Sequence, residues 1–164
     1  MAEWSLNIDD WVKDAKKKTK AVKRKFAFAC YAEIAKRTPV DTGRARANWN
    51  VSVGKPDYST DEEKTCKDGE PLPHKESEFE ADGDESIYIT NNLPYIKTLE
   101  FGGYPEEVKK GTWVKGKSRG KGKRGPGHYE IRSRGGYSKQ APQGMVGITL
   151  ASAEKILNAV LRTE

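Results

Sequence analysis

The sequence predicts an α+β fold in which a long N-terminal helix and a C-terminal helix pack on a small, mainly antiparallel sheet. Residues 7–37 carry apolar side chains at three- and four-residue steps, which is the spacing of one helix face. Residues 44–53 alternate polar and apolar side chains, as a half-buried strand does, and residues 87–90 form a second strand pattern. Helical spacing returns from residue 142 onward.

The size and composition of the chain fit one domain over residues 1–164 with a modest core. The chain has 164 residues and a mass of 18.3 kDa. Because only 35% of the residues are hydrophobic and 33% are charged, some segments must be solvated loops or partner-facing surface. The formal net charge of +6 and the pI of about 9.2 permit a polyanionic partner.

The sequence gives no sign of a membrane, a disulfide or a metal. No apolar run is long enough for a membrane span or a signal-peptide core, so we expect a cytosolic product. Cys30 lies in a helical pattern as a small buried hydrophobe. Cys66 lies in a charged loop, and the isolated His74 is the nearest ligand-type residue. We therefore expect no cofactor.

The first helix has an apolar face and a basic face. Asn7 is the expected N-cap, with Asp9 and Asp10 in the first turn, where carboxylates interact favourably with the helix dipole. Phe26 belongs to the apolar stripe and is expected in the core. The opposite face is usually solvated in such helices, but its density of charge also suggests an anionic neighbour. The candidate contacts there are Lys16, Lys17 and Lys18.

A turn ends this helix. Pro39 disfavours the helical conformation at Thr38. Asp41 and Thr42 can direct side-chain oxygens to nearby backbone N–H groups, and Gly43 tolerates the positive φ that a tight turn needs. These residues are expected to be structural, because an aspartate that caps a turn is far commoner than a catalytic one.

The central part of the chain supplies most of the expected core. In the strand over residues 44–53, Arg44 lies on the wet face and is a candidate contact residue. A short helix from Pro94 should end at Gly102. The expected core anchors here are Trp49, Tyr95, Leu99 and Phe101.

Two long charged insertions interrupt this pattern. Residues 55–86 are acidic and poor in apolar side chains, so we expect a long solvated loop that has room for a hairpin extension. Its candidate contacts are Glu76, Glu78 and Glu80, and it lacks the ligand spacing of a calcium loop. Residues 104–136 are basic and rich in glycine, so this segment should bury little and should be mobile or become ordered only on a partner. Its candidate contacts are Lys117, Arg119, Lys121, Lys123 and Arg124.

The last segment is expected to return to the sheet over residues 137–141 and then to form a helix opened by Pro142. Gly144 and Gly147 weaken the helical pattern at its start.

The sequence offers little catalytic chemistry. The two histidines, His74 and His128, lie in expected loops, so a histidine-based nucleophile or base pair is not expected. Periodicity does not explain Trp4, Tyr104 and Trp113, which we interpret as anchors on another chain.

Three blocks together resemble the neck and tail-completion proteins of tailed bacteriophages. They are Thr38-Pro-Val-Asp-Thr-Gly-Arg44 leading to Trp49, then Ile87-Tyr-Ile-Thr-Asn-Asn-Leu-Pro-Tyr-Ile96 with Leu99-Glu-Phe-Gly102, and Ser138-Lys-Gln-Ala-Pro-Gln-Gly-Met-Val146. The blocks occur in the family's order. The two charged insertions depart from the compact family pattern.

The resemblance implies a non-enzymatic virion protein, made in the cytoplasm of the bacterial host. It implies a small α+β subunit that acts in homo-oligomeric rings, commonly six-fold, where a long-tailed phage joins its tail to its head. Other neck and tail proteins would be its partners, and no small-molecule substrate is implied.

Several partners for the charged segments stay open at this stage. The acidic loop of one subunit can pair with the basic loop of the next, head to tail around a ring. The competing hypothesis is a sequence-independent DNA-binding protein whose basic surfaces face the passing viral DNA. An enzyme is the third and least favoured class.

Overall fold

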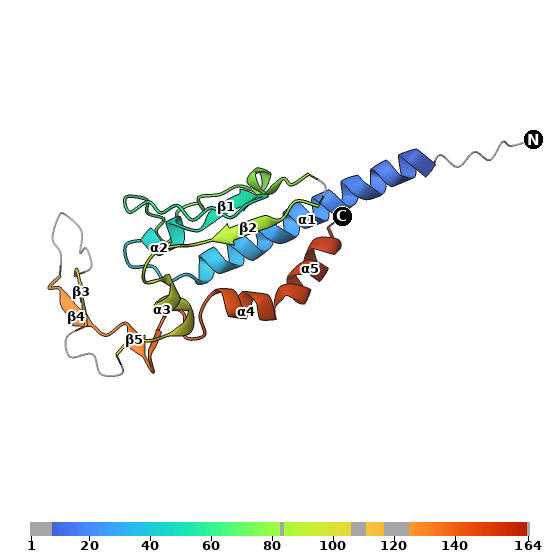
Figure 1. The fold of residues 1–164 in the computed structure, drawn as a ribbon. Helices are drawn as coiled ribbons and strands as arrows, with labels where there is room; N and C mark the ends of the chain where they lie inside the picture. The colour runs from blue at the N-terminus through green and yellow to red at the C-terminus, as the bar shows by residue number, and fades with distance from the viewer. Residues whose placement is uncertain (1–7, 83, 106–110, 117–124, 164) are drawn as a thin grey trace, which may run out of the picture.

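The structure, a computed structural model, describes residues 8–82, 84–105, 111–116 and 125–163, and of residues 8–11 the backbone alone. It is α+β, as the sequence predicts: a long N-terminal helix, C-terminal helices and small antiparallel sheets. Helix α1 (Ile8–Arg37) is the central element, and its first turns project beyond the rest of the molecule (Figure 1). The predicted N-cap at Asn7 lies outside the described residues.

Two layers cover the C-terminal part of α1 from opposite sides. The hairpin of β1 (Asn50–Val53) and β2 (Ile87–Thr90) lies on one side, and helices α4 (Val146–Ala151) and α5 (Ala153–Leu161) lie on the other (Figure 1). β1 and β2 are antiparallel, with Asn50 opposite Thr90 and Val53 opposite Ile87.

The first half of the predicted strand over residues 44–53 is wrong. Residues Arg44–Ala47 form a helical turn, α2, and only Asn50–Val53 are extended. The amide of Ala47 donates to the Gly43 carbonyl at 3.0 Å, and the amide of Asn48 donates to the Arg44 carbonyl at 3.2 Å. Alternation of apolar and polar residues over so few positions does not distinguish a strand from a helical turn with buried alanines. Alanine and arginine also both favour helix.

The prediction of β2 is confirmed, and the short helix after it is present but begins at Ile96 instead of Pro94. Helix α3 (Ile96–Phe101) ends at Gly102, which has a φ of 80°. The amide of Gly102 donates to the Thr98 carbonyl at 3.0 Å, which closes the last turn.

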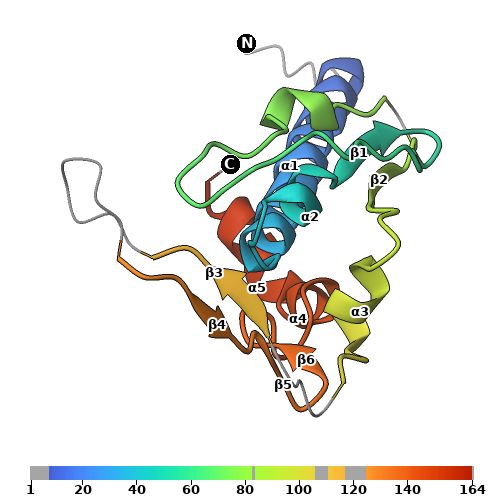
Figure 2. The ribbon, with the colours of Figure 1, turned by 90° about the vertical axis from the view of Figure 1, so that its left-hand side faces the viewer.

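The segment after α3 forms an arm. β3 (Thr112–Val114) pairs with β4 (His128–Glu130), and β5 (Ser133–Arg134) pairs with β6 (Tyr137–Ser138) (Figure 2). The predicted return of residues 137–141 to the main sheet is wrong, because β6 pairs with its sequence neighbour β5 instead.

The C-terminal helix begins later than the sequence predicts. It starts at Val146 rather than at Pro142, and it is divided at Ser152 into α4 and α5. Residues 141–145 adopt bridges and turns, with Gly144 at a φ of 75°.

The core lies between α1, α3, α4 and the hairpin. Its fully buried side chains include Tyr31, Phe79 and Met145. Trp49 and Leu99 belong to it, whereas Phe26 is half-buried on α1.

The expectation that Phe101 and Tyr95 lie in the core is not met, because they are 75% and 39% exposed. In a helix of six residues only one face can reach the core, and α3 uses Leu99 for that contact.

Candidate functional site

Thr38 connects the end of α1 to Trp49. Its hydroxyl donates to the Ile34 carbonyl at 2.8 Å and accepts the indole N–H of Trp49 at 2.8 Å. Thr38 and Trp49 are both buried, so each buried polar group has its partner. The hydroxyl of Thr38 therefore links the first sequence block to Trp49.

Gly43 allows the segment at Cys66 to cross the turn. Gly43 has a φ of 86°, and its carbonyl accepts the amide of Cys66 at 3.1 Å. A Cβ at this position would lie 2.6 Å from the Cys66 oxygen. The turn thus requires glycine for its backbone conformation and for the close approach. Thr42 accepts the amide of Arg44 at 3.3 Å, as the turn prediction expects of its hydroxyl.

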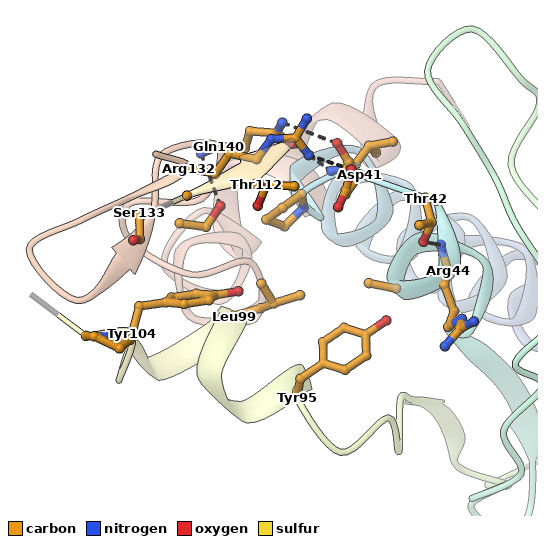
Figure 3. A pocket seen from close by; sticks show the side chains of 17 residues that line it. Asp41, Thr42, Arg44, Tyr95, Leu99, Tyr104, Thr112, Arg132, Ser133 and Gln140 are labelled. Carbon is orange, nitrogen blue, oxygen red and sulfur yellow. Dashed lines mark hydrogen bonds and ion pairs between the residues drawn. The ribbon is translucent and has the colours of Figure 1, made fainter. Parts of the chain in front are cut away.

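A pocket of about 640 Å³ lies between this turn, α3 and the base of the arm (Figure 3). Asp41 Oδ1 forms an ion pair with Arg132 Nη1 at 2.6 Å across one rim. The side chain of Gln140 pairs with the backbone of Val40, accepting its amide at 2.6 Å and donating to its carbonyl at 3.3 Å. Asp41, predicted to cap the turn, therefore helps to hold the arm to it.

The pocket's chemistry is that of a binding surface. Tyr95 and Tyr104 flank Leu99 in it (Figure 3). Burial raises the pKa of both phenols, so they remain neutral hydrogen-bonding groups at neutral pH. Its lining contains neither histidine nor cysteine, and its aspartate is held by an arginine.

Glu100 joins the second sequence block to the third. Its carboxylate accepts the backbone amides of Met145 at 2.7 Å, Val146 at 2.9 Å and Gly147 at 2.8 Å. These amides begin α4 and have no partner within the helix, so the carboxylate caps it. A Cβ on Gly144 would lie 2.4 Å from the Glu100 carbonyl oxygen. The glycine that weakens the helix pattern thus makes room for its cap.

The sequence interpretation missed Glu100 and Gln140 as contact residues. Both lie inside the quoted blocks, and the pair of glycines before and within α4 was the available signal. Their partners are about 40 or more residues away in the sequence, so spacing alone could not identify them.

A second, apolar groove of about 330 Å³ lies between α3 and α4. Trp49, Ile96, Phe101, Val146 and Leu150 contribute its apolar lining, and Lys97 and Glu100 are its charged residues. Phe101 and Leu150 are 75% and 64% exposed. Two large apolar side chains side by side in water are typical of a contact surface.

The acidic segment lies along α1 instead of extending into solvent. Arg24 forms ion pairs with Glu76 at 3.0 Å and Glu80 at 2.8 Å, and Lys20 pairs with Asp82 at 2.7 Å. Phe79, in the short 3-10 helix η1 (Glu76–Phe79), is fully buried among the aromatic rings of the core.

One buried aromatic residue and several ion pairs therefore hold this part of the segment to α1, while most of its side chains are exposed. Oε2 of Glu78 lies 2.6 Å from Nδ1 of His74. Burial raises the pKa of Glu78, but the hydrogen bonds from His74 and from the Lys75 amide lower it by more, so the net shift of this pKa is downward. Cys66, which the sequence places in a charged loop, is buried.

The remaining candidates lie apart from one another. Lys16, Lys17 and Lys18 are exposed on the projecting part of α1. Arg44 is 3.7 Å from Glu62. Trp113 on the arm packs against Tyr129, with ring centroids 5.0 Å apart, and both rings are about half exposed. Trp4 and the five basic candidates between Lys117 and Arg124 lie outside the described residues.

The described part of the chain holds neither a cluster of metal-ligating side chains nor a helix that could span a membrane. There, no three side chains of the histidine, cysteine, aspartate or glutamate type come together as metal ligands. None of the described helices combines the length and the apolar character that crossing a bilayer requires.

Comparison with known proteins gives one match. The model of the HK97-gp10-like family, described as "Bacteriophage HK97-gp10, putative tail-component", matches residues 5–102. This region contains α1, the turn at Gly43, the β1–β2 hairpin and α3. No curated protein and no solved structure matches.

Proposed function

Since the chain belongs to the HK97-gp10-like family of bacteriophage tail components, we propose that it is a ring-forming tail-completion or neck subunit that joins the tail of a long-tailed phage to its head. The description of the family is that of a bacteriophage tail component. The family therefore supports a role in the virion tail, and the ring and its position at the neck are the proposal.

The observation that carries this proposal is the presence of two separate apolar surfaces on one small subunit. One is the groove with Phe101 and Leu150 between α3 and α4, and the other is the arm with Trp113 and Tyr129. A ring subunit at the head–tail junction contacts copies of itself and other virion proteins, so it needs more than one contact surface. Six copies are the expected number, by the resemblance of the sequence blocks.

Direct pairing between the acidic and basic insertions of neighbouring subunits has less support. Arg24 and Lys20 of the same chain already neutralise Glu76, Glu80 and Asp82. The arm therefore has another partner, which we place among the neighbouring tail and neck proteins.

Particle assembly tests the proposal. In a phage that lacks the gene, we expect filled heads and separate tails, and supplying the protein in trans should restore joined particles. A reconstruction of the neck should show a ring of this subunit between head and tail. Joined, infectious particles without the protein would contradict the proposal.

Sequence-independent DNA binding is the competing function. The observation that favours it is the exposure of Lys16, Lys17 and Lys18 on a helix end that projects from the body. Lysine contacts to phosphates release counterions, so affinity for duplex DNA should fall steeply with salt. Replacing these three lysines with glutamine should then abolish retention of the isolated chain on DNA. If the isolated chain does not bind DNA at low salt, this function is excluded.

A further inference from the structure

Among the described residues, none fills the groove between α3 and α4. The exposed Phe101 and Leu150, the buried Trp49 and the charged Lys97 all line it. We infer that this groove binds residues 1–7 of a second copy of the chain, with Trp4 and Leu6 as the apolar anchors. This inference rests on the proposed ring and names the contact between its neighbours.

The position of the groove excludes the subunit's own N-terminal residues. The indole of Trp49 is bonded to Thr38, directly after the last residue of α1, so the groove lies near the C-terminal end of that helix. With 30 residues, α1 is about 45 Å long. Trp4 precedes Ile8 by four residues, so it lies within about 14 Å of the opposite end of the helix. Trp4 therefore cannot reach the groove of its own subunit.

The projection of α1 makes the segment available to a neighbour. The first turns of α1 extend past the body, so the helix end that residues 1–7 precede in the sequence is remote from the core (Figure 1). The segment belongs to one end of the subunit and the groove lies near the other end. Binding of the segment of one copy in the groove of the next would therefore be a head-to-tail contact. Such contacts close into a ring when the rotation between copies is suitable.

The chemistry of the segment matches that of the groove. Trp4 and Leu6 are two residues apart, so in an extended chain both side chains point to the same face. Glu3, next to Trp4 in the sequence, is opposite in charge to Lys97, which lines the groove. Tryptophan is the residue most often found as an energetic anchor in a pocket of an interface.

The experiment uses a peptide of residues 1–10 and the full chain carrying Trp4→Glu, so that the chain's own segment does not compete. The peptide is titrated while backbone and methyl NMR signals are followed. We expect saturable binding, with shifts concentrated at Ile96, Phe101, Val146 and Leu150. A peptide with Trp4→Ala should bind about 30-fold more weakly.

Changes in the groove provide the matched variants. Leu150→Glu should weaken binding about 30-fold, and because Leu150 is 64% exposed the variant should fold. Lys97→Glu gives a second variant in the lining of the groove, and Glu3→Lys in the peptide should restore part of the lost affinity. Tyr58→Ala, at an aromatic residue that is 63% exposed elsewhere, should leave the affinity unchanged.

The outcomes separate this inference from the proposed function. If the peptide does not saturate at millimolar concentration, or if the shifts lie on another face, the inference is wrong, even when particles still require the protein. If groove shifts between full-length copies survive Trp4→Glu and disappear with Trp113→Glu, the arm is the occupant and the inference is also wrong. Particles that join without the protein would instead overturn the proposed function, whatever the peptide does.

Discussion

Gly43 has two separate requirements for glycine, its φ of 86° and the Cys66 backbone directly above it. Gly69 has nearly the same φ of 85°, but nothing lies within 4 Å of the position of its Cβ. The two residues therefore separate backbone strain from steric exclusion within one protein.

We predict that Gly69→Val lowers the free energy of unfolding by the strain of positive φ alone, about 1–3 kcal/mol. Gly43→Val should cost more, because it must also displace the segment at Cys66. Urea unfolding of both variants measures the difference. An unchanged unfolding midpoint for Gly43→Val would show that the turn does not depend on this residue.

Glu100 is the second residue whose role is defined by its contacts, since its carboxylate accepts the amides of Met145, Val146 and Gly147. Loss of a helix cap typically costs about 0.5–2 kcal/mol. We predict that Glu100→Ala lowers unfolding free energy by about 2 kcal/mol and that Glu100→Gln, which keeps one acceptor oxygen, loses less. The exposed Glu154→Ala is the control and should change stability by less than about 0.5 kcal/mol. Equal stability of Glu100→Ala and Glu154→Ala would contradict the capping role.

At the scale of elements, α3 has one face for the core and one for a partner. Leu99 is 5% exposed and Phe101 is 75% exposed, two residues apart on the same helix. This arrangement means that neighbouring substitutions should separate folding from assembly.

Truncation of Leu99 to Ala should lower unfolding free energy by about 2–5 kcal/mol, because it opens a cavity in the core. Phe101→Ala should change subunit stability by less than about 1 kcal/mol and should reduce ring or particle assembly. Thermal unfolding and oligomer mass, measured on both variants, test this pair. A strongly destabilised Phe101→Ala subunit would place the residue in the core after all.

The acidic segment is held to α1 through ion pairs and one buried ring, so its order depends on charge. Replacing Glu76, Glu80 and Asp82 with their amides should increase hydrogen exchange in residues 76–85. Surface ion pairs weaken as salt rises, so salt should produce part of the same effect in the unchanged protein. The matched control is Asp84→Asn, at an exposed residue of the same segment. Unchanged protection in the triple variant would mean that Phe79 alone holds the segment.

At the scale of the whole molecule, the arm is separate from the core. None of the core side chains comes from the described residues of β3, β4 or β5, and the arm meets the body through contacts such as those of Arg132 and Gln140. The subunit can therefore lose the arm without losing its hydrophobic core.

Replacing residues 115–134 with a short glycine-serine linker should leave the thermal midpoint nearly unchanged and should impair particle completion. The aromatic pair provides a finer version: Trp113→Ala with Tyr129→Ala should impair completion while retaining the arm. Particle counts and infectivity after complementation are the measurement. Normal completion with the deleted arm would remove it from the assembly surfaces.

The sequence by itself determined the elements whose signals are local. The apolar repeat defined α1, Pro39 and Gly43 defined the turn, and the short strand and helix before Gly102 followed from alternation and capping. Each of these features depends on residues within a few positions of one another, so a pattern in the chain is sufficient.

The tertiary structure alone decided the contacts between distant segments and the faces left exposed. The carboxylate of Glu100 caps a helix that begins 46 residues later, and the acidic segment folds back 52 or more residues onto α1. The sequence separation between the two residues of such a contact is not fixed, because the chain between them can have any length. Whether an apolar residue such as Phe101 is core or contact surface depends on how many faces of a short helix the body can cover, and only the packed molecule settles that.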